Sequence, residues 1–140
     1  MDFDLSLAVE QTAQNPVFYV QYAHARICSI IKKLAESDIS PREVTETELL
    51  LLDVPEEIAL IRKLALLPGE IAAAADRLDP SGLTRYVTDL ATLFHKFYTA
   101  CRVQVDEDSL MQARLRLCLC VRTALSNTLS LMKINAPESM

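Results

Sequence analysis

Two tyrosines and an arginine are spaced along one predicted helix so that their side chains share a stripe. Tyr19, Tyr22 and Arg26 stand at positions i, i+3 and i+7, which are neighbours on a helical surface. At 3.6 residues per turn, this stripe lies roughly 90° from the centre of the helix's apolar stripe. Aromatic rings and a guanidinium plane placed there could hold splayed single-stranded bases. From the residues alone, the simpler interpretation is that the tyrosines seal the core edge and the arginine is solvated.

Three other side chains of this kind flank the predicted core. Tyr98 sits at the edge of the apolar stripe of the helix that follows Pro80. It could be a tyrosine at the rim of the core or a contact to a ligand, and the residues alone do not decide between these. His95 lies farther round the same flank, where it could reach a ligand or simply be exposed. His24 lies on the other flank of its helix, and we expect it to be structural, with a hydrogen bond to a neighbouring backbone or side-chain group.

Residues for catalysis or metal binding are not evident in this chain. Two glycines cannot build a phosphate-binding loop. The two histidines, His24 and His95, fall on different helices, and no catalytic serine or cysteine arrangement accompanies them, so we predict no catalytic residue. The cysteines form no CxxC pair, and we expect reduced, mostly buried thiols rather than a metal site. They are Cys28, Cys101, Cys118 and Cys120.

Charge is unevenly distributed along the chain. The net charge of −5 argues mildly against a simple nucleic-acid binder. The acidic residues crowd positions 36–57, which we expect to be a solvated face turned away from RNA. Basic residues dominate the last predicted helix, so that one end of the molecule could be basic while another is acidic. These basic residues are Arg114, Arg116, Arg122 and Lys133.

The sequence also predicts where the protein resides. The acidic start Met1-Asp2-Phe3-Asp4 lacks the basic beginning of a signal peptide. No apolar run approaches the roughly 20 residues of a membrane span. We therefore expect a soluble, cytoplasmic protein with no membrane partner.

The pattern of the chain is that of a single all-α domain over residues 1–140. Scarce glycine, plentiful Ala, Leu, Arg and Glu, and apolar residues at three-four spacing favour helices. We predict a helical bundle of four long helices plus one or two short ones, in which the helix from Pro16 packs against those from Pro80 and Ser109. Asn15 and Asp79, each followed by proline, and Asp53 with Glu56 are the expected helix starts. The expected helices span residues 5–14, 16–36, 46–52, 53–67, 70–78, 80–101 and 106–133.

Several blocks of sequence resemble the C-terminal anticodon-binding domain of arginyl-tRNA synthetases. The longest is Asn15-Pro16-Val17-Phe18-Tyr19-Val20-Gln21-Tyr22-Ala23-His24-Ala25-Arg26, which is long enough to be specific. The others are Asp2-Phe3-Asp4-Leu5, Leu93-Phe94-His95-Lys96-Phe97-Tyr98, Ala113-Arg114-Leu115 and Ala136-Pro137-Glu138-Ser139-Met140. Their order and spacing agree over essentially the whole chain.

This resemblance implies a class I synthetase anticodon-binding domain of the DALR type. In the family it follows a catalytic domain that joins L-arginine to tRNA(Arg) with ATP and magnesium. That catalytic domain and its ATP-binding signatures are missing here, so we expect a C-terminal fragment with no cofactor of its own, in which Met1 is an artificial start. The Asp-Ala-Leu-Arg string is expected upstream of Asp2. The expected partners are the anticodon loop of tRNA(Arg) and the catalytic domain of the same chain, in a monomer.

The resemblance also assigns roles to particular residues. It implies that Tyr19, Tyr22, Arg26, Tyr98 and Met140 bind the anticodon, and we expect the first four to open onto a single surface. His95 is a possible further RNA contact. Two alternatives remain, a stand-alone helical adaptor for a protein partner and the related domain of another synthetase, such as the larger subunit of the glycyl enzyme. The Tyr-x-x-Tyr-x-x-x-Arg stripe argues against both.

Overall fold

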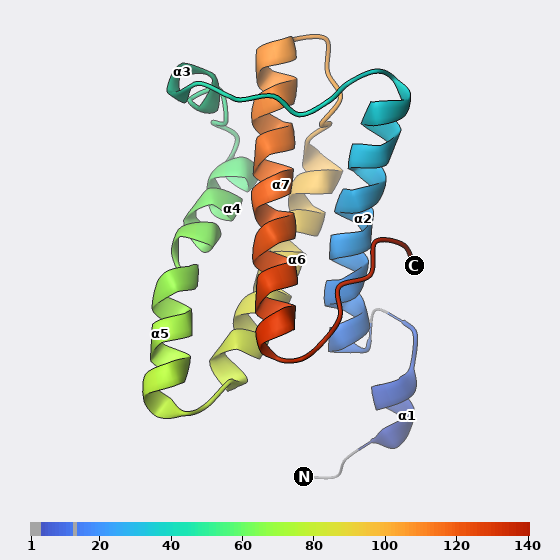
Figure 1. Ribbon diagram of the computed structural model, residues 1–140, viewed down its shortest axis with the longest axis vertical. Helices are drawn as coiled ribbons and strands as arrows, with labels where there is room; N and C mark the ends of the chain where they lie inside the picture. Colours follow the sequence, from blue (N-terminus) through green and yellow to red (C-terminus); the bar gives the residue numbers. More distant parts are fainter. Residues whose placement is uncertain (1–3, 13) are drawn as a thin grey trace.

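The computed structural model describes residues 4–12 and 14–140, and in this part of the chain the regular structure is entirely helical (Figure 1). No strand is present among these residues. The all-α prediction is therefore confirmed. The helices are α1 (Leu5–Val9), α2 (Pro16–Glu36), α3 (Glu46–Leu49), α4 (Pro55–Ala65), α5 (Leu67–Arg77), α6 (Ser81–Ala100) and α7 (Asp108–Leu131).

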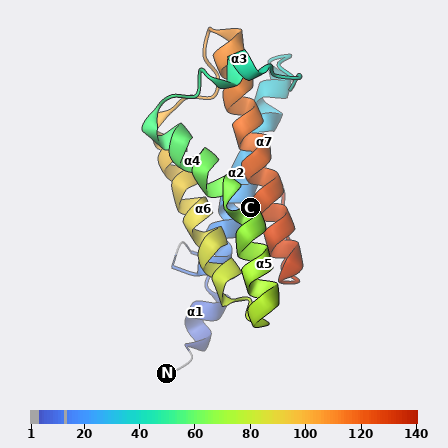
Figure 2. The same ribbon diagram turned by 90° about the vertical axis from the view of Figure 1, so that its left-hand side faces the viewer.

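Four columns of helix surround one apolar core. Helices α2, α6 and α7 contact one another pairwise, as predicted from their apolar spacing. The fourth column is α4 followed almost directly by α5, and Figure 2 shows this column in front of α6 and α7. The core is filled by large side chains that are fully buried, among them Ile27, Leu60, Leu90, Phe94, Phe97, Leu115, Leu125 and Leu129.

Local side-chain caps explain where the helices begin. The Asn15 side-chain oxygen accepts a hydrogen bond from the Val17 N–H at 3.0 Å, and Pro16 occupies the first turn of α2, because a helix start leaves its first N–H groups without helical partners. The Asp79 carboxylate likewise accepts from the Ser81 N–H at 2.9 Å at the start of α6. The predicted Asn15 cap is confirmed, whereas at α6 the helix begins one residue later than predicted, with Pro80 before its first residue Ser81.

Several predicted boundaries are wrong. The first and third expected helices, 5–14 and 46–52, end early at Val9 and Leu49, and the boundaries around α4 and α5 are shifted by a short distance. The box at the start of α4 uses Glu57 rather than Glu56, because the Glu57 carboxylate accepts from the Val54 N–H at 3.1 Å. Pro68 does not lie between two helices but in the first turn of α5, and the break is at Leu66. A proline in the first turn loses no hydrogen bond, because a backbone N–H at that position has no helical partner and proline has no N–H.

The N-terminal half of α7 carries a buried ion pair that changes the predicted charge distribution. Arg114 Nε donates to Glu57 Oε1 at 2.7 Å, and Arg114 Nη1 donates to the Arg102 carbonyl at 2.7 Å. Glu57 has no exposed surface. Glu57 is therefore not part of a solvated acidic face, and Arg114 adds no charge to a basic surface. The two predictions are wrong at these two residues, because their charges neutralise each other inside the bundle.

The segment after α7 turns back and runs along α2. Gln21 Nε2 donates to the Asn135 carbonyl at 2.9 Å, and His24 Nδ1 lies 2.9 Å from the Pro137 carbonyl. Figure 1 shows the C-terminus beside α2. The expected structural role of His24 is confirmed, because its ring is buried and bonded to a backbone group. In the part of the chain that the structure describes, no helix is long and apolar enough to cross a lipid bilayer.

Candidate functional site

A groove of about 760 Å³ opens between α2, the end of α6, α7 and the C-terminal segment. Four of the predicted site residues line it, although they come from three separate parts of the chain. Tyr22 and Arg26 come from α2, Tyr98 from α6, and Met140 from the C-terminal segment. The remaining lining residues are Ala25, Cys28, Ser29, Ile30, Ile31, Lys32, Lys33, Ala35, Arg122, Glu138 and Ser139.

The guanidinium of Arg26 lies between two tyrosine rings at one side of this groove. Its Cζ is 4.8 Å from the centre of the Tyr22 ring and 4.5 Å from the centre of the Tyr98 ring. Arg26 Nη2 also donates to the Tyr22 hydroxyl at 2.9 Å. Such distances are those of cation–π contacts, which hold a flexible arginine in place. Tyr22 and Tyr98 are 38% and 41% exposed, so each ring keeps open surface for a ligand.

Tyr19 stands behind the groove rather than in its lining. Its ring is packed against the core, 5.0 Å from the His95 ring, and its hydroxyl donates to Thr92 Oγ1 at 3.3 Å. The stripe predicted from helical spacing therefore divides. Tyr22 and Arg26 line the groove, whereas Tyr19 does not line it and packs against the His95 ring. A contact of Tyr19 with RNA stays a prediction.

His95 lies under the same cluster. Its ring centre is 5.9 Å from that of Tyr22, and its Nδ1 is 3.2 Å from Arg26 Nη1. Burial lowers the pKa of His95 below its usual value, and the positive charge of Arg26 lowers it further. The ring is half-buried and is not among the residues that line the groove. His95 is therefore partly covered by Arg26 and Tyr22, and a contact of His95 with RNA stays a prediction.

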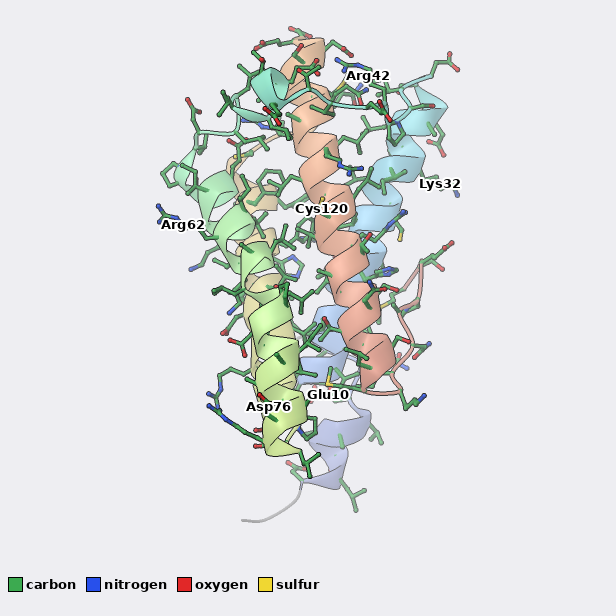
Figure 3. The ribbon with its side chains drawn as sticks, turned by 60° about the vertical axis from the view of Figure 1, so that its left-hand side comes forward. Glu10, Lys32, Arg42, Arg62, Asp76 and Cys120 are labelled. Carbon is green, nitrogen blue, oxygen red and sulfur yellow. The ribbon has the colours of Figure 1, made fainter. Side chains whose placement is uncertain are left out.

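The groove is basic although the protein is net acidic. Four cationic side chains line it, and Glu138 is the one acidic residue among its lining residues. The cations are Arg26, Lys32, Lys33 and Arg122. Figure 3 shows Lys32 extending outward from α2. Of the basic residues predicted on the last helix, Arg122 is here, whereas Arg116 is exposed beside a different hollow, lined by Leu64 and Leu67.

Sequence reasoning missed the part of this groove toward the C-terminal end of α2, although a signal was present. Ser29 and Lys33 continue the stripe of Tyr22 and Arg26 at spacings of three and four residues. Extending the stripe by two turns would have found them. Arg122 had no such signal, because its place depends on how α7 packs against α2.

The cysteines are as expected with one exception. Cys101 and Cys118 are buried and Cys28 is half-buried, but Cys120 is exposed on α7 (Figure 3). Burial raises the pKa of Cys118 to about 12 and also raises that of Cys28, where nearby Arg122 opposes the effect. Within residues 4–12 and 14–140, no group of three His, Cys, Asp or Glu side chains is placed to hold a metal ion.

Comparison with known proteins shows one consistent relationship. The family described as "DALR anticodon binding domain" matches residues 20–140. The chain is 54% identical over 140 residues to the arginine–tRNA ligase of Ruminiclostridium cellulolyticum and 52% identical to that of Caldanaerobacter subterraneus subsp. tengcongensis, and covers 100% of itself and 25% of each relative. The solved arginyl-tRNA synthetase of Thermus thermophilus matches with a TM-score of 0.82 at 30% identity, over 100% of this chain and 24% of that one. The chain spans about a quarter of the length of these relatives, and it belongs to the DALR anticodon-binding domain family of arginyl-tRNA synthetases.

Proposed function

We propose that the basic groove receives unpaired bases of the anticodon loop of tRNA(Arg). The observation that carries this proposal is the guanidinium of Arg26 held between the half-exposed rings of Tyr22 and Tyr98. Flat aromatic and guanidinium surfaces that remain accessible are what single-stranded bases stack on. Membership of an anticodon-binding family supports the same interpretation.

The residues around the stacking cluster have complementary tasks. Lys32, Lys33 and Arg122 neutralise phosphates of the loop as it crosses the groove, while Met140 provides an apolar wall. With so few cations, phosphate contacts alone give weak binding that falls steeply with added salt. Specificity for unpaired bases therefore comes from stacking and from hydrogen bonds at base edges.

The reaction that this binding serves lies outside the chain. We infer that the whole protein is a cytoplasmic, monomeric arginine–tRNA ligase, whose catalytic part attaches L-arginine to tRNA(Arg) with ATP and magnesium. The relatives that carry the name arginine–tRNA ligase are about four times as long as this chain, which covers 25% of each. In this division the groove holds one end of the tRNA and contributes no catalytic residue. An anticodon loop held here keeps the acceptor end in register for the distant catalytic part.

The decisive experiment is the affinity of the chain for an RNA stem-loop with an arginine anticodon. Replacing Tyr22 by Ala removes one stacking face and one hydrogen-bond partner of Arg26. Stacking is worth roughly 1–3 kcal/mol per base, so the dissociation constant should rise about 5- to 150-fold. Tyr22→Phe, which keeps the ring, should bind far better than Tyr22→Ala.

A matched control separates the groove from the general charge of the protein. Arg26→Ala and Arg116→Ala remove the same charge, one inside the groove and one on another face. Only Arg26→Ala should weaken RNA binding strongly, provided that circular dichroism shows both variants folded. Equal affinities for folded Tyr22→Ala and the original chain would refute the role of the groove.

A further inference from the structure

The position of His95 is unusual because one of its ring nitrogens has a hydrogen-bonding partner and the other, although buried, has none among the described residues. Nδ1 faces the guanidinium of Arg26 at 3.2 Å. Nε2 is buried, and among the described residues it has no hydrogen-bonding partner. Most buried polar side-chain atoms in proteins have a partner, so an unpartnered one requires an explanation. A histidine chosen for packing alone would be better replaced by an apolar ring.

The contact with Arg26 fixes the proton on the His95 ring. A guanidinium has only donors, so Nδ1 can interact with it only as an acceptor. Neutral imidazole then carries its proton on Nε2, the atom with no partner. The groups of α2 that face the ring are Tyr19, Tyr22 and the charged Arg26, and no carboxylate is among them. Nothing in these contacts favours a proton on Nδ1.

We propose that His95 is a positioning residue that acts on the groove through Arg26 and accepts a hydrogen bond that locks the guanidinium between Tyr22 and Tyr98. The inference rests on the proposed function and refines it. Arg26 is then held from two directions, by the Tyr22 hydroxyl at Nη2 and by His95 at Nη1. Because two of its donors are fixed, the guanidinium plane keeps one orientation. Less side-chain entropy of Arg26 is then lost when a base binds. The buried, unpartnered Nε2 is the cost of this arrangement.

Two substitutions separate positioning from packing. His95→Phe keeps an aromatic ring beside Tyr19 and Tyr22 but removes the acceptor and the unpartnered nitrogen. We expect an unchanged or higher melting temperature together with an affinity for the anticodon stem-loop that is lower by about tenfold or more, the size of one lost charge-assisted hydrogen bond. His95→Asn returns an acceptor near the position of Nδ1 and should recover part of the affinity despite a lower melting temperature.

Nitrogen NMR of the free protein tests the inference without RNA. Two-bond nitrogen–proton spectra should show the proton of His95 on Nε2, and the side-chain N–H signals of Arg26 should broaden or shift in His95→Phe as the guanidinium gains freedom. A proton on Nδ1, or Arg26 signals that do not change, would overturn the positioning role. So would affinities that follow the melting temperatures across the variants.

The same experiments keep the two proposals apart. If the original chain does not bind the stem-loop while the NMR signals behave as expected, the proposed function fails and the Arg26–His95 contact stands. If the chain binds RNA and Tyr22→Ala weakens it but His95→Phe does not, the groove is confirmed and the positioning role is refuted.

Discussion

Replacing Arg114 by Met should destabilise the fold more than any change in the groove. The arginine is buried in the N-terminal half of α7 and joins this helix to two other parts of the chain, Glu57 at the start of α4 and the Arg102 carbonyl after α6. Methionine has a similar length and preserves most of the packing. The variant therefore isolates the loss of the two 2.7 Å hydrogen bonds and of the positive charge.

The expected loss in the free energy of unfolding follows from the buried Glu57 carboxylate that remains without its partner. Glu57 has no exposed surface, and among the residues that the structure describes it keeps one hydrogen-bond partner in this variant, the Val54 N–H at 3.1 Å. Removal of one member of a buried pair typically costs about 3–5 kcal/mol, because the other charge is left without compensation. Whole domains have stabilities of about 5–15 kcal/mol, so this substitution removes a large part of the total.

Urea unfolding followed by circular dichroism measures this effect. Arg116→Met is the matched control on the same helix, since Arg116 is exposed and its replacement should change the free energy of unfolding by less than about 0.5 kcal/mol. Adding Glu57→Gln to Arg114→Met should restore part of the loss, because a neutral amide is easier to bury than a carboxylate. A loss below about 1 kcal/mol for Arg114→Met would contradict the assignment of a buried, coupled ion pair.

Two further predictions concern titration and thiol chemistry. Stability should decline as the pH falls below about 6.5, because the pKa of His95 is lowered in the folded state and the unfolded chain takes up the proton more readily. RNA binding should decline at a lower pH, where the folded protein protonates His95 and loses the acceptor for Arg26. Titrations in which His95→Phe declines equally would contradict this. Maleimide labelling followed by mass spectrometry should show exposed Cys120 modified first. Cys118 should react only on unfolding, because it is buried and its pKa is raised to about 12. Rapid labelling of Cys118 in the folded protein would show that α7 is not packed as described.

The sequence was sufficient for most of the helical fold because its signals are local. Asn15 before Pro16 and Asp79 before Pro80 identify helix starts from the side chain that caps them. The three-four apolar spacing identified which faces of α2, α6 and α7 meet. The errors were local as well. Adjacent glutamates at 56 and 57 left the start of α4 uncertain by one residue, and only the geometry shows which of them bends back to Val54.

The site was only partly accessible from the sequence. Tyr22 and Arg26 could be grouped because one helix fixes their angular relation, and the same spacing would have added Ser29 and Lys33. The resemblance to a family supplied Tyr98 and Met140. Their spacing alone gave no reason to place them beside α2.

The tertiary structure decided which charges and rings are available for binding. It neutralised Arg114 with Glu57 in the interior and brought Arg122 to the groove. It also placed the half-buried His95 ring against Arg26. Helical periodicity determines where a side chain points around the axis of its own helix. How deeply that side chain is buried, and what faces it, depends on the rotation and depth at which a second helix packs, and these are properties of the assembled core.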